Sequence, residues 1–114
     1  SLLEVLEKEL VQRNRILPCY LQVNVSGESS KGGVSPEETG NVISQIREEA
    51  GHIDLAGLMT MAPAEKNPRP FFRRLRELGQ EFGLSGLSMG MSQDFEIAIE
   101  EGATCIRIGG GIFR

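Results

Sequence analysis

The chain has 114 residues, of which 39% are hydrophobic and 25% charged, a balance typical of one soluble domain rather than of a disordered, membrane or disulfide-rich protein. Its formal charge of −4 argues against a nucleic-acid partner, because a phosphate-binding surface needs clustered lysine and arginine. No signal peptide, long apolar span or lipidation motif is apparent, which predicts a cytoplasmic protein without a membrane partner.

The first two predicted elements are a helix over residues 1–14 and a strand over 19–26. Ser1 and Glu4 stand at capping-box spacing, and leucines at helical spacing follow them. The strand, CYLQVNVS, is rich in β-forming residues. Its weak alternation is typical of a strand that is covered on both faces.

A second helix and a second strand follow a glycine- and serine-rich loop. Ser35 is the expected N-cap of a helix over residues 35–51, with Pro36 at its first helical position and Gly51 at its end. The apolar run IDLAGLM then predicts a strand over residues 53–59.

The same order of elements continues to the end of the chain. Phenylalanines and leucines at helical spacing predict a helix over 69–83, and a strand is expected over 84–90. Ser92 is the expected cap of a short helix over 93–102. The run TCIRIG predicts a fourth strand over 104–109.

Strands and helices alternate without a hairpin signal, which predicts an α/β fold of parallel strands joined by helical crossovers. A (β/α)8 barrel takes about 250 residues, so the four βα repeats of this chain look like about half of a TIM-type barrel. An open four-stranded sheet with helices is the other solution, and it would leave two strand edges to be covered. Either way, residues 1–114 are expected to form a single domain.

Several polar side chains have ordinary structural interpretations. Cys19 and Cys105 lie in apolar runs and are expected to be small, buried, unpaired residues of a reducing compartment. His52, beside a helix end, is expected to be a capping or surface residue. A solvated helix face is predicted from four arginines at helical spacing, Arg69, Arg73, Arg74 and Arg76.

Glycines and a hydroxyl gather where the last predicted strands end, which is where parallel βα folds bind ligands. The glycines that follow Arg107 would present bare backbone N–H groups to an anion, and Ser92 would add a hydroxyl at a helix start. A flexible glycine tail and an ordinary N-cap serine are the alternatives. Arg107 itself needs an acceptor, either on a ligand or on a carboxylate such as Asp94 or Glu96.

Four stretches, LQVNVSGESSKGG, LAGLMTM, LSMGMSQDFEIAIEEGAT and IRIGGGIF, occur in the order and spacing of a known family. Together they resemble the pyridoxal phosphate homeostasis proteins, the YggS/PROSC family. The resemblance runs through nearly the whole chain and corresponds to the carboxyl-terminal half of that family. It implies a barrel similar to the amino-terminal domain of alanine racemase, of the fold type III kind, that binds pyridoxal 5'-phosphate (PLP).

The resemblance also implies which residues bind the cofactor: Ser92, Arg107, Gly109, Gly110, Met89 and Asn24. Ser92 and the backbone around Gly109 and Gly110 would hold the phosphate, although the family usually has threonine or serine at position 110. Arg107 would face the pyridine nitrogen. Because an arginine cannot accept a proton, the ring nitrogen would stay unprotonated and the cofactor would be a weak electron sink.

The family's Schiff-base lysine belongs to its first strand, and none of Lys8, Lys31 and Lys66 matches it. The resemblance therefore implies a non-catalytic PLP-binding protein of cofactor homeostasis, present as its phosphate-binding half. One alternative is a fragment of an amino-acid racemase or other phosphate-binding barrel enzyme, for which Tyr20 is the only tyrosine. Another is a half-barrel without independent activity that self-associates through strand edges or pairs with the amino-terminal half.

Overall fold

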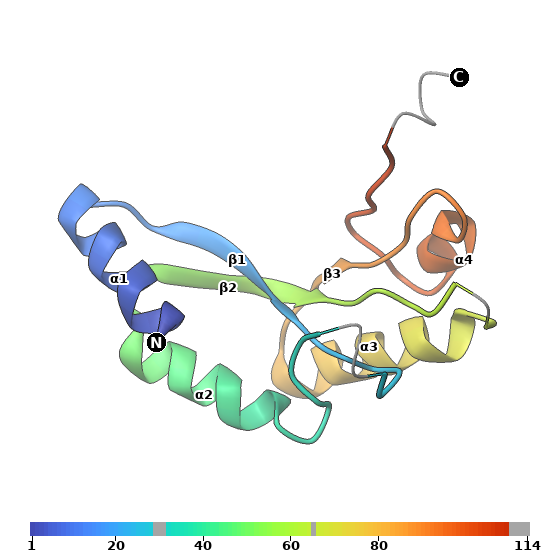
Figure 1. Ribbon diagram of the computed structural model, residues 1–114, viewed down its shortest axis with the longest axis horizontal. Coiled ribbons are helices and arrows are strands. Elements are labelled where there is room, and N and C mark those ends of the chain that lie inside the picture. The colour runs from blue at the N-terminus through green and yellow to red at the C-terminus, as the bar shows by residue number, and fades with distance from the viewer. Residues whose placement is uncertain (29–31, 65, 110–114) are drawn as a thin grey trace.

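The computed structural model describes residues 1–28, 32–64 and 66–109. Helices and strands alternate through this part of the chain (Figure 1). In chain order the elements are α1 (Leu2–Arg13), β1 (Leu17–Gln22), α2 (Thr39–Glu49), β2 (Ile53–Met59), α3 (Arg69–Phe82), β3 (Gly86–Ser88) and α4 (Phe95–Glu100).

The strands form one parallel sheet in the order β1-β2-β3. Hydrogen bonds between neighbouring chains continue beyond the strand ends, because Val23 donates to the carbonyl of Met59 (2.8 Å) and Thr60 donates to that of Ser88 (3.1 Å). All three strands therefore end at the same edge of the sheet. The predicted parallel βα arrangement is confirmed.

The prediction of a fourth strand over residues 104–109 is wrong. This segment runs beside β3, but only an isolated parallel bridge joins Cys105 to Ser88. The hydroxyl of Thr104 accepts the backbone N–H of Leu87 at 2.8 Å and so occupies a donor that a regular ladder would use. The segment is consequently an irregular neighbour of β3.

The core lies between the sheet and the helices α2 and α3, which pack on the same side of it (Figure 1). Its buried residues come from β2, β3, α2, α3, α4 and the segments before or after the strands: Val23, Ile43, Leu58, Ala62, Phe72, Leu75, Leu78, Leu84, Leu87, Met89 and Ala98. The helix predicted from the spacing of phenylalanines and leucines is therefore the main cover of the strands that lead to the candidate site.

Two predicted helix starts can be compared with the structure. Ser1 caps α1 as expected, because its hydroxyl accepts the N–H of Glu4 at 3.4 Å. Ser35 likewise accepts the N–H of Glu38 at 3.2 Å, but α2 begins only at Thr39, after a turn. Among the described helices, none is long and apolar enough to cross a membrane.

Candidate functional site

The chain after β3 makes a tight turn into α4. Gly90 has a φ of 107°, and a Cβ added there would lie 2.7 Å from the Cβ of Ala98. Glycine at this position therefore lets α4 fold back directly against the end of β3. The residue that closes the turn is Asp94, whose Oδ1 accepts the N–H of Met91 at 2.7 Å.

Ser92 is not the cap of α4, which corrects the sequence prediction. The helix begins at Phe95 and its N-cap is Asp94, so the cap falls two residues later than expected. The side chain of Ser92 is exposed, and no residue of the described chain bonds its hydroxyl. Its donor and acceptor are thus available to a ligand.

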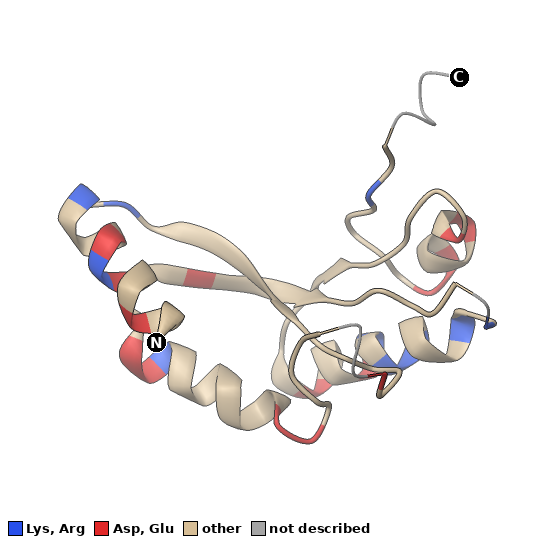
Figure 2. Cartoon of the chain, in the orientation of Figure 1, with Lys and Arg blue, Asp and Glu red and all other residues tan. Residues whose placement is uncertain are grey.

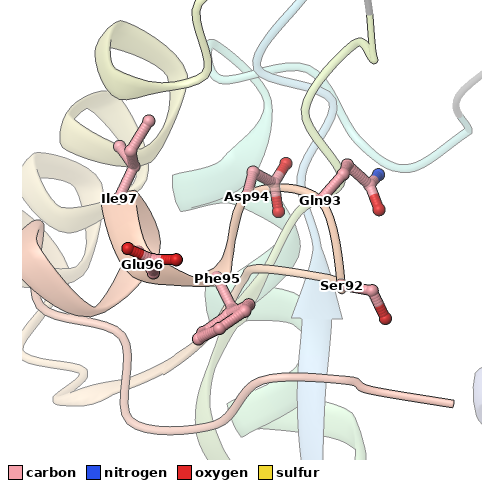
Figure 3. A pocket seen from close by; sticks show the side chains of 6 residues that line it. All are labelled: Ser92, Gln93, Asp94, Phe95, Glu96 and Ile97. Carbon is pink, nitrogen blue, oxygen red and sulfur yellow. The ribbon is translucent and has the colours of Figure 1, made fainter. Parts of the chain in front are cut away.

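A shallow pocket of about 250 Å³ lies at this turn (Figure 3). Residues 92–97 line it. Figure 3 shows the hydroxyl of Ser92 on the far side of the turn from Glu96, pointing outwards. The pocket is open to solvent, so the described residues do not enclose a small molecule there.

Arg107 lies beside this turn because its backbone N–H donates to the carbonyl of Gly90 at 2.9 Å. Its side chain is exposed and forms no ion pair with any carboxylate in the described residues. Asp94, one of the expected partners, is occupied instead by the N–H of Met91. The guanidinium is therefore free to bind an acceptor on a ligand.

Of the two glycines that were predicted to hold the phosphate, only Gly109 lies within the described residues. Gly109 is exposed, and a Cβ added there would have no other atom within 4 Å, so its backbone is open to a ligand. Gly110 lies outside the described residues. The structure thus places the backbone of Arg107 beside the turn that contains Ser92. The roles of Ser92, Arg107, Gly109 and Gly110 in binding a cofactor stay predictions.

Met89 does not fit the role predicted for it. Its side chain is 1% exposed and belongs to the core cluster. Only its backbone borders the candidate site, where its N–H donates to the carbonyl of Cys105 at 3.0 Å. The structure therefore argues against Met89 as a side chain that lines the cofactor.

Asn24 lies in a different pocket, of about 360 Å³, formed by the loop after β1. Its amide nitrogen donates to the carbonyl of Glu28 (2.7 Å), and its Oδ1 accepts from the hydroxyl of Ser26 (3.2 Å) and the N–H of Gly27 (3.1 Å). These bonds shape the loop. A contact between Asn24 and a cofactor stays a prediction.

The cysteines are both free, as expected, but they differ in exposure. Cys19 is partly buried, and burial, with a smaller contribution from the charge of Asp54, raises the pKa of its thiol. Cys105 is exposed, so the prediction that it is buried is wrong. Its apolar neighbours in sequence do not enclose it, since the segment around it is not a covered strand.

His52 serves as a structural contact rather than as part of the candidate site. Its backbone N–H donates to Oε1 of Glu7 at 2.9 Å, and its Nδ1 lies 3.0 Å from Oε2 of the same residue. This contact ties α1 to the start of β2. Among the described residues, no three His, Cys, Asp or Glu side chains group as metal ligands would.

The lysines do not join the site within the described residues. Lys8 is exposed on α1, and Lys66 is exposed in the loop before α3. Lys31 lies outside the described residues. The groups that could donate to an anion at the end of β3 are therefore the guanidinium of Arg107 and the hydroxyl of Ser92, while Asp94 and Glu96 line the same pocket.

The family model of the alanine racemase N-terminal domain matches residues 1–114. The chain belongs to this family. Relatives in the family include the pyridoxal phosphate homeostasis proteins of Aquifex aeolicus, 43% identical over 99% of this chain, and of Mus musculus, 41% identical over 85%. That of Pseudomonas aeruginosa is 46% identical over 82% of this chain. The resemblance to this family that was read from the sequence is confirmed, whereas correspondence to its carboxyl-terminal half stays a prediction.

Solved structures of the same kind give the fold. PipY of Synechococcus elongatus without PLP superposes with a TM-score of 0.85 at 31% identity over 99% of this chain, and PipY with PLP bound with a TM-score of 0.81 at 29% identity over 96%. The expected fold, parallel βα repeats from a TIM-type barrel, is confirmed. The chain spans about half the length of these proteins, namely 53% of the Aquifex relative and 57% and 54% of the two PipY chains.

Proposed function

We propose that this chain is part of a PLP-binding protein of cofactor homeostasis and supplies the side of the site that holds the phosphate and faces the pyridine nitrogen. The observation that carries the proposal concerns Arg107 and Ser92, whose side chains have no partner in the described chain. The backbone bond from Arg107 to Gly90 brings the two residues to one strand end. The names of the curated relatives and the PLP bound to PipY support the choice of ligand.

Each group has a separate role in this proposal. The hydroxyl of Ser92 and the backbone N–H groups around Gly109 and Gly110 donate to the phosphate, which carries the negative charge that such donors stabilise. The guanidinium of Arg107 faces the ring nitrogen. PLP supplies an aldehyde and an electron-withdrawing ring when bound, and an arginine that keeps its proton leaves that ring less electron-withdrawing. This favours storage and delivery of the cofactor over catalysis.

The open shape of the pocket leads to a second part of the proposal. The pocket lined by residues 92–97 is open to solvent and does not enclose a ligand. We propose that the opposite wall, with the Schiff-base lysine, comes from residues outside this sequence, and that this chain corresponds to the carboxyl-terminal half of the relatives. Lys8 and Lys66, both exposed and on other elements, support this assignment.

A titration of the chain with PLP tests the site. We expect saturable binding that inorganic phosphate competes away, and no stoichiometric lysine adduct in the mass spectrum after borohydride reduction. Ser92→Ala is expected to weaken PLP binding about 10- to 100-fold, because a hydrogen bond to a charged group contributes about 1.5–3 kcal/mol. Ser44→Ala, on the exposed face of α2, is the matched control and should bind like the parent chain.

Three outcomes would count against the proposal. Binding that is unaffected by phosphate and by Ser92→Ala would place the ligand elsewhere. A stoichiometric adduct on Lys8, Lys31 or Lys66 would show that the chain carries its own lysine. Amino-acid racemisation that is lost in Tyr20→Phe would favour the racemase alternative.

We also propose that the β1 edge of the sheet associates with another barrel segment, either the remaining half or a second copy. An apolar groove of about 260 Å³ lies between α1 and this edge, and Leu2 and Tyr20 beside it are 82% and 43% exposed. Sedimentation velocity should show self-association that Leu2→Lys reduces. A chain that stays monomeric at high concentration would contradict association with a second copy.

A further inference from the structure

A buried carboxylate lies at the carboxyl end of α4. Glu101 caps this helix, and its side chain is only 4% exposed. Glutamate is rarely buried unless its charge is paired. Glu101 is paired by three cations, which all come from one face of α3, namely Arg69, Arg73 and Arg76.

Both oxygens of this carboxylate are satisfied. Oε2 accepts from Arg69 at 2.7 Å and from Arg73 at 3.0 Å, and Oε1 accepts from Arg73 and from Arg76, both at 3.2 Å. Arg76 also donates to the backbone carbonyl of Glu101 at 3.2 Å. Figure 2 shows the acidic residues of α4 close to the basic residues of α3. Three of the arginines predicted to form a solvated face therefore also pair with Glu101, although their side chains stay 35–52% exposed.

Glu101 lies in the stretch of chain between the two parts of the candidate site. The segment that contains α4 connects the turn with Ser92 to the segment with Arg107, so both parts of the candidate site are joined through it. After Glu101 the chain turns at Gly102, whose φ is 104°, and returns to β3, where Thr104 donates to the carbonyl of Leu87 at 2.9 Å.

The helix α4 has too few residues to be stable alone. It spans Phe95–Glu100, whereas isolated helices shorter than about 12–15 residues are marginal in water. Its position must come from tertiary contacts. Ala98, inside the helix, packs against Gly90, and the arginines of α3 hold Glu101 at the carboxyl end.

We propose that Glu101, held by Arg69, Arg73 and Arg76, is a positioning residue that keeps the Ser92 turn and the Arg107 segment together at the end of β3. The role of Glu101 in ligand binding rests on the proposed function, whereas its role in holding the two segments together does not. A neutral amide at position 101 would keep the size of the side chain. It would also leave three neighbouring guanidinium groups without their shared counter-charge, and they would repel one another.

Hydrogen exchange followed by NMR tests the inference in the chain without ligand. Three amides report on the site: those of Met89, bonded to Cys105, of Met91, bonded to Asp94, and of Arg107, bonded to Gly90. Glu101→Gln is expected to raise their exchange rates about tenfold or more, because local opening becomes easier. The amide of Val23, bonded to Met59 on the far side of the sheet, should change little.

Glu100→Gln is the matched control. Glu100 is the adjacent glutamate on the same helix, but its side chain is 61% exposed and it pairs only with Arg69, at 2.6 Å. We expect normal exchange in this variant, and partial recovery in Glu101→Asp, which keeps the charge. Unchanged exchange in Glu101→Gln, or an equal increase in Glu100→Gln, would overturn the inference.

The pH dependence of amide exchange tests whether the negative charge of Glu101, rather than the shape of its side chain, holds the two segments together. Hydrogen bonds from Arg73 and then Arg69 lower the pKa of Glu101 to about 2, and Glu100 and Glu77 are the other charged groups close to these arginines. Since the folded-state pKa is depressed, the stabilisation is present above the ordinary value of 4.5 and is lost as the pH falls toward 2. The three amides should therefore stay protected from pH 7 to 4. Loss of protection near pH 4.5 would contradict a paired carboxylate.

Ligand titrations then connect the cluster to the proposed function. Glu101→Gln should weaken binding of PLP by a larger factor than binding of pyridoxal, which lacks the phosphate that Ser92 would hold. Equal losses for both ligands would contradict a role in positioning the phosphate side. A parent chain that binds no PLP would refute the proposed function, and the exchange experiment would still decide the role of Glu101.

Discussion

Replacing Gly57 by alanine is expected to destabilise the chain by about 3 kcal/mol or more, because the added methyl group overlaps the neighbouring strand. Gly57 lies in β2 and pairs with Tyr20 of β1 and Gly86 of β3. A Cβ at position 57 would collide with the backbone carbonyl of Gly86, which cannot move aside as a flexible side chain could. Pairing of β2 with β3 should therefore be lost first.

Urea unfolding measures this effect, and Gly51→Ala is its control. Gly51 is exposed between α2 and β2, with no atom within 4 Å of an added Cβ and no positive φ. This second variant should unfold within about 1 kcal/mol of the parent chain. If both variants unfold at the same urea concentration, close approach of the strands is not what requires glycine at position 57.

The general order of strands and helices was predictable because it depends on local patterns of apolar residues. The fourth strand was not, since the residues over 104–109 have an apolar pattern that favours a strand. A regular strand does not form there because the hydroxyl of Thr104 accepts a hydrogen bond from the N–H of Leu87, seventeen residues earlier in the chain. A contact over that distance in sequence has no local signature. The start of α2 at Thr39 shows the same limit, because a capping pattern at Ser35 is also compatible with a turn.

Part of the candidate site was also predictable, because it depends on the order of the strands and helices. Ser92 and Arg107 follow consecutive βα units, and parallel strands place their carboxyl ends together whatever their register. The burial of Met89 was not predictable. It depends on the face of the sheet on which this residue lies, and β3, with three residues, is too short for an alternating pattern to show that.

Glu101 was missed altogether, although the sequence contains a signal for it. Arg69, Arg73 and Arg76 recur at intervals of four and three residues, which places them on one face of a helix. Several cations on one face can indicate a carboxylate on a neighbouring element. The partner itself, 25 to 32 residues further along the chain, could be identified only from the packing of α4 against α3.

Phe72→Ala is expected to cost about 3–5 kcal/mol, because the side chain is fully buried and its removal leaves a cavity between α3 and the sheet. Phe71 offers a control of identical chemistry, since it is the adjacent residue of α3 and only partly buried. Phe71→Ala should therefore cost less. Thermal unfolding of both variants measures the difference, and a loss for Phe71→Ala as large as that for Phe72→Ala would contradict the described packing of α3.

This substitution also distinguishes general stability from the positioning of the site. A cavity under α3 weakens the whole core, so Phe72→Ala should speed exchange of amides throughout the sheet, including that of Val23. Glu101→Gln removes a charge at one end of α4 and should speed exchange only near β3. Because α3 contributes both Phe72 to the core and the arginines that hold Glu101, the two variants together show whether this helix supports the candidate site through its apolar face or through its charges.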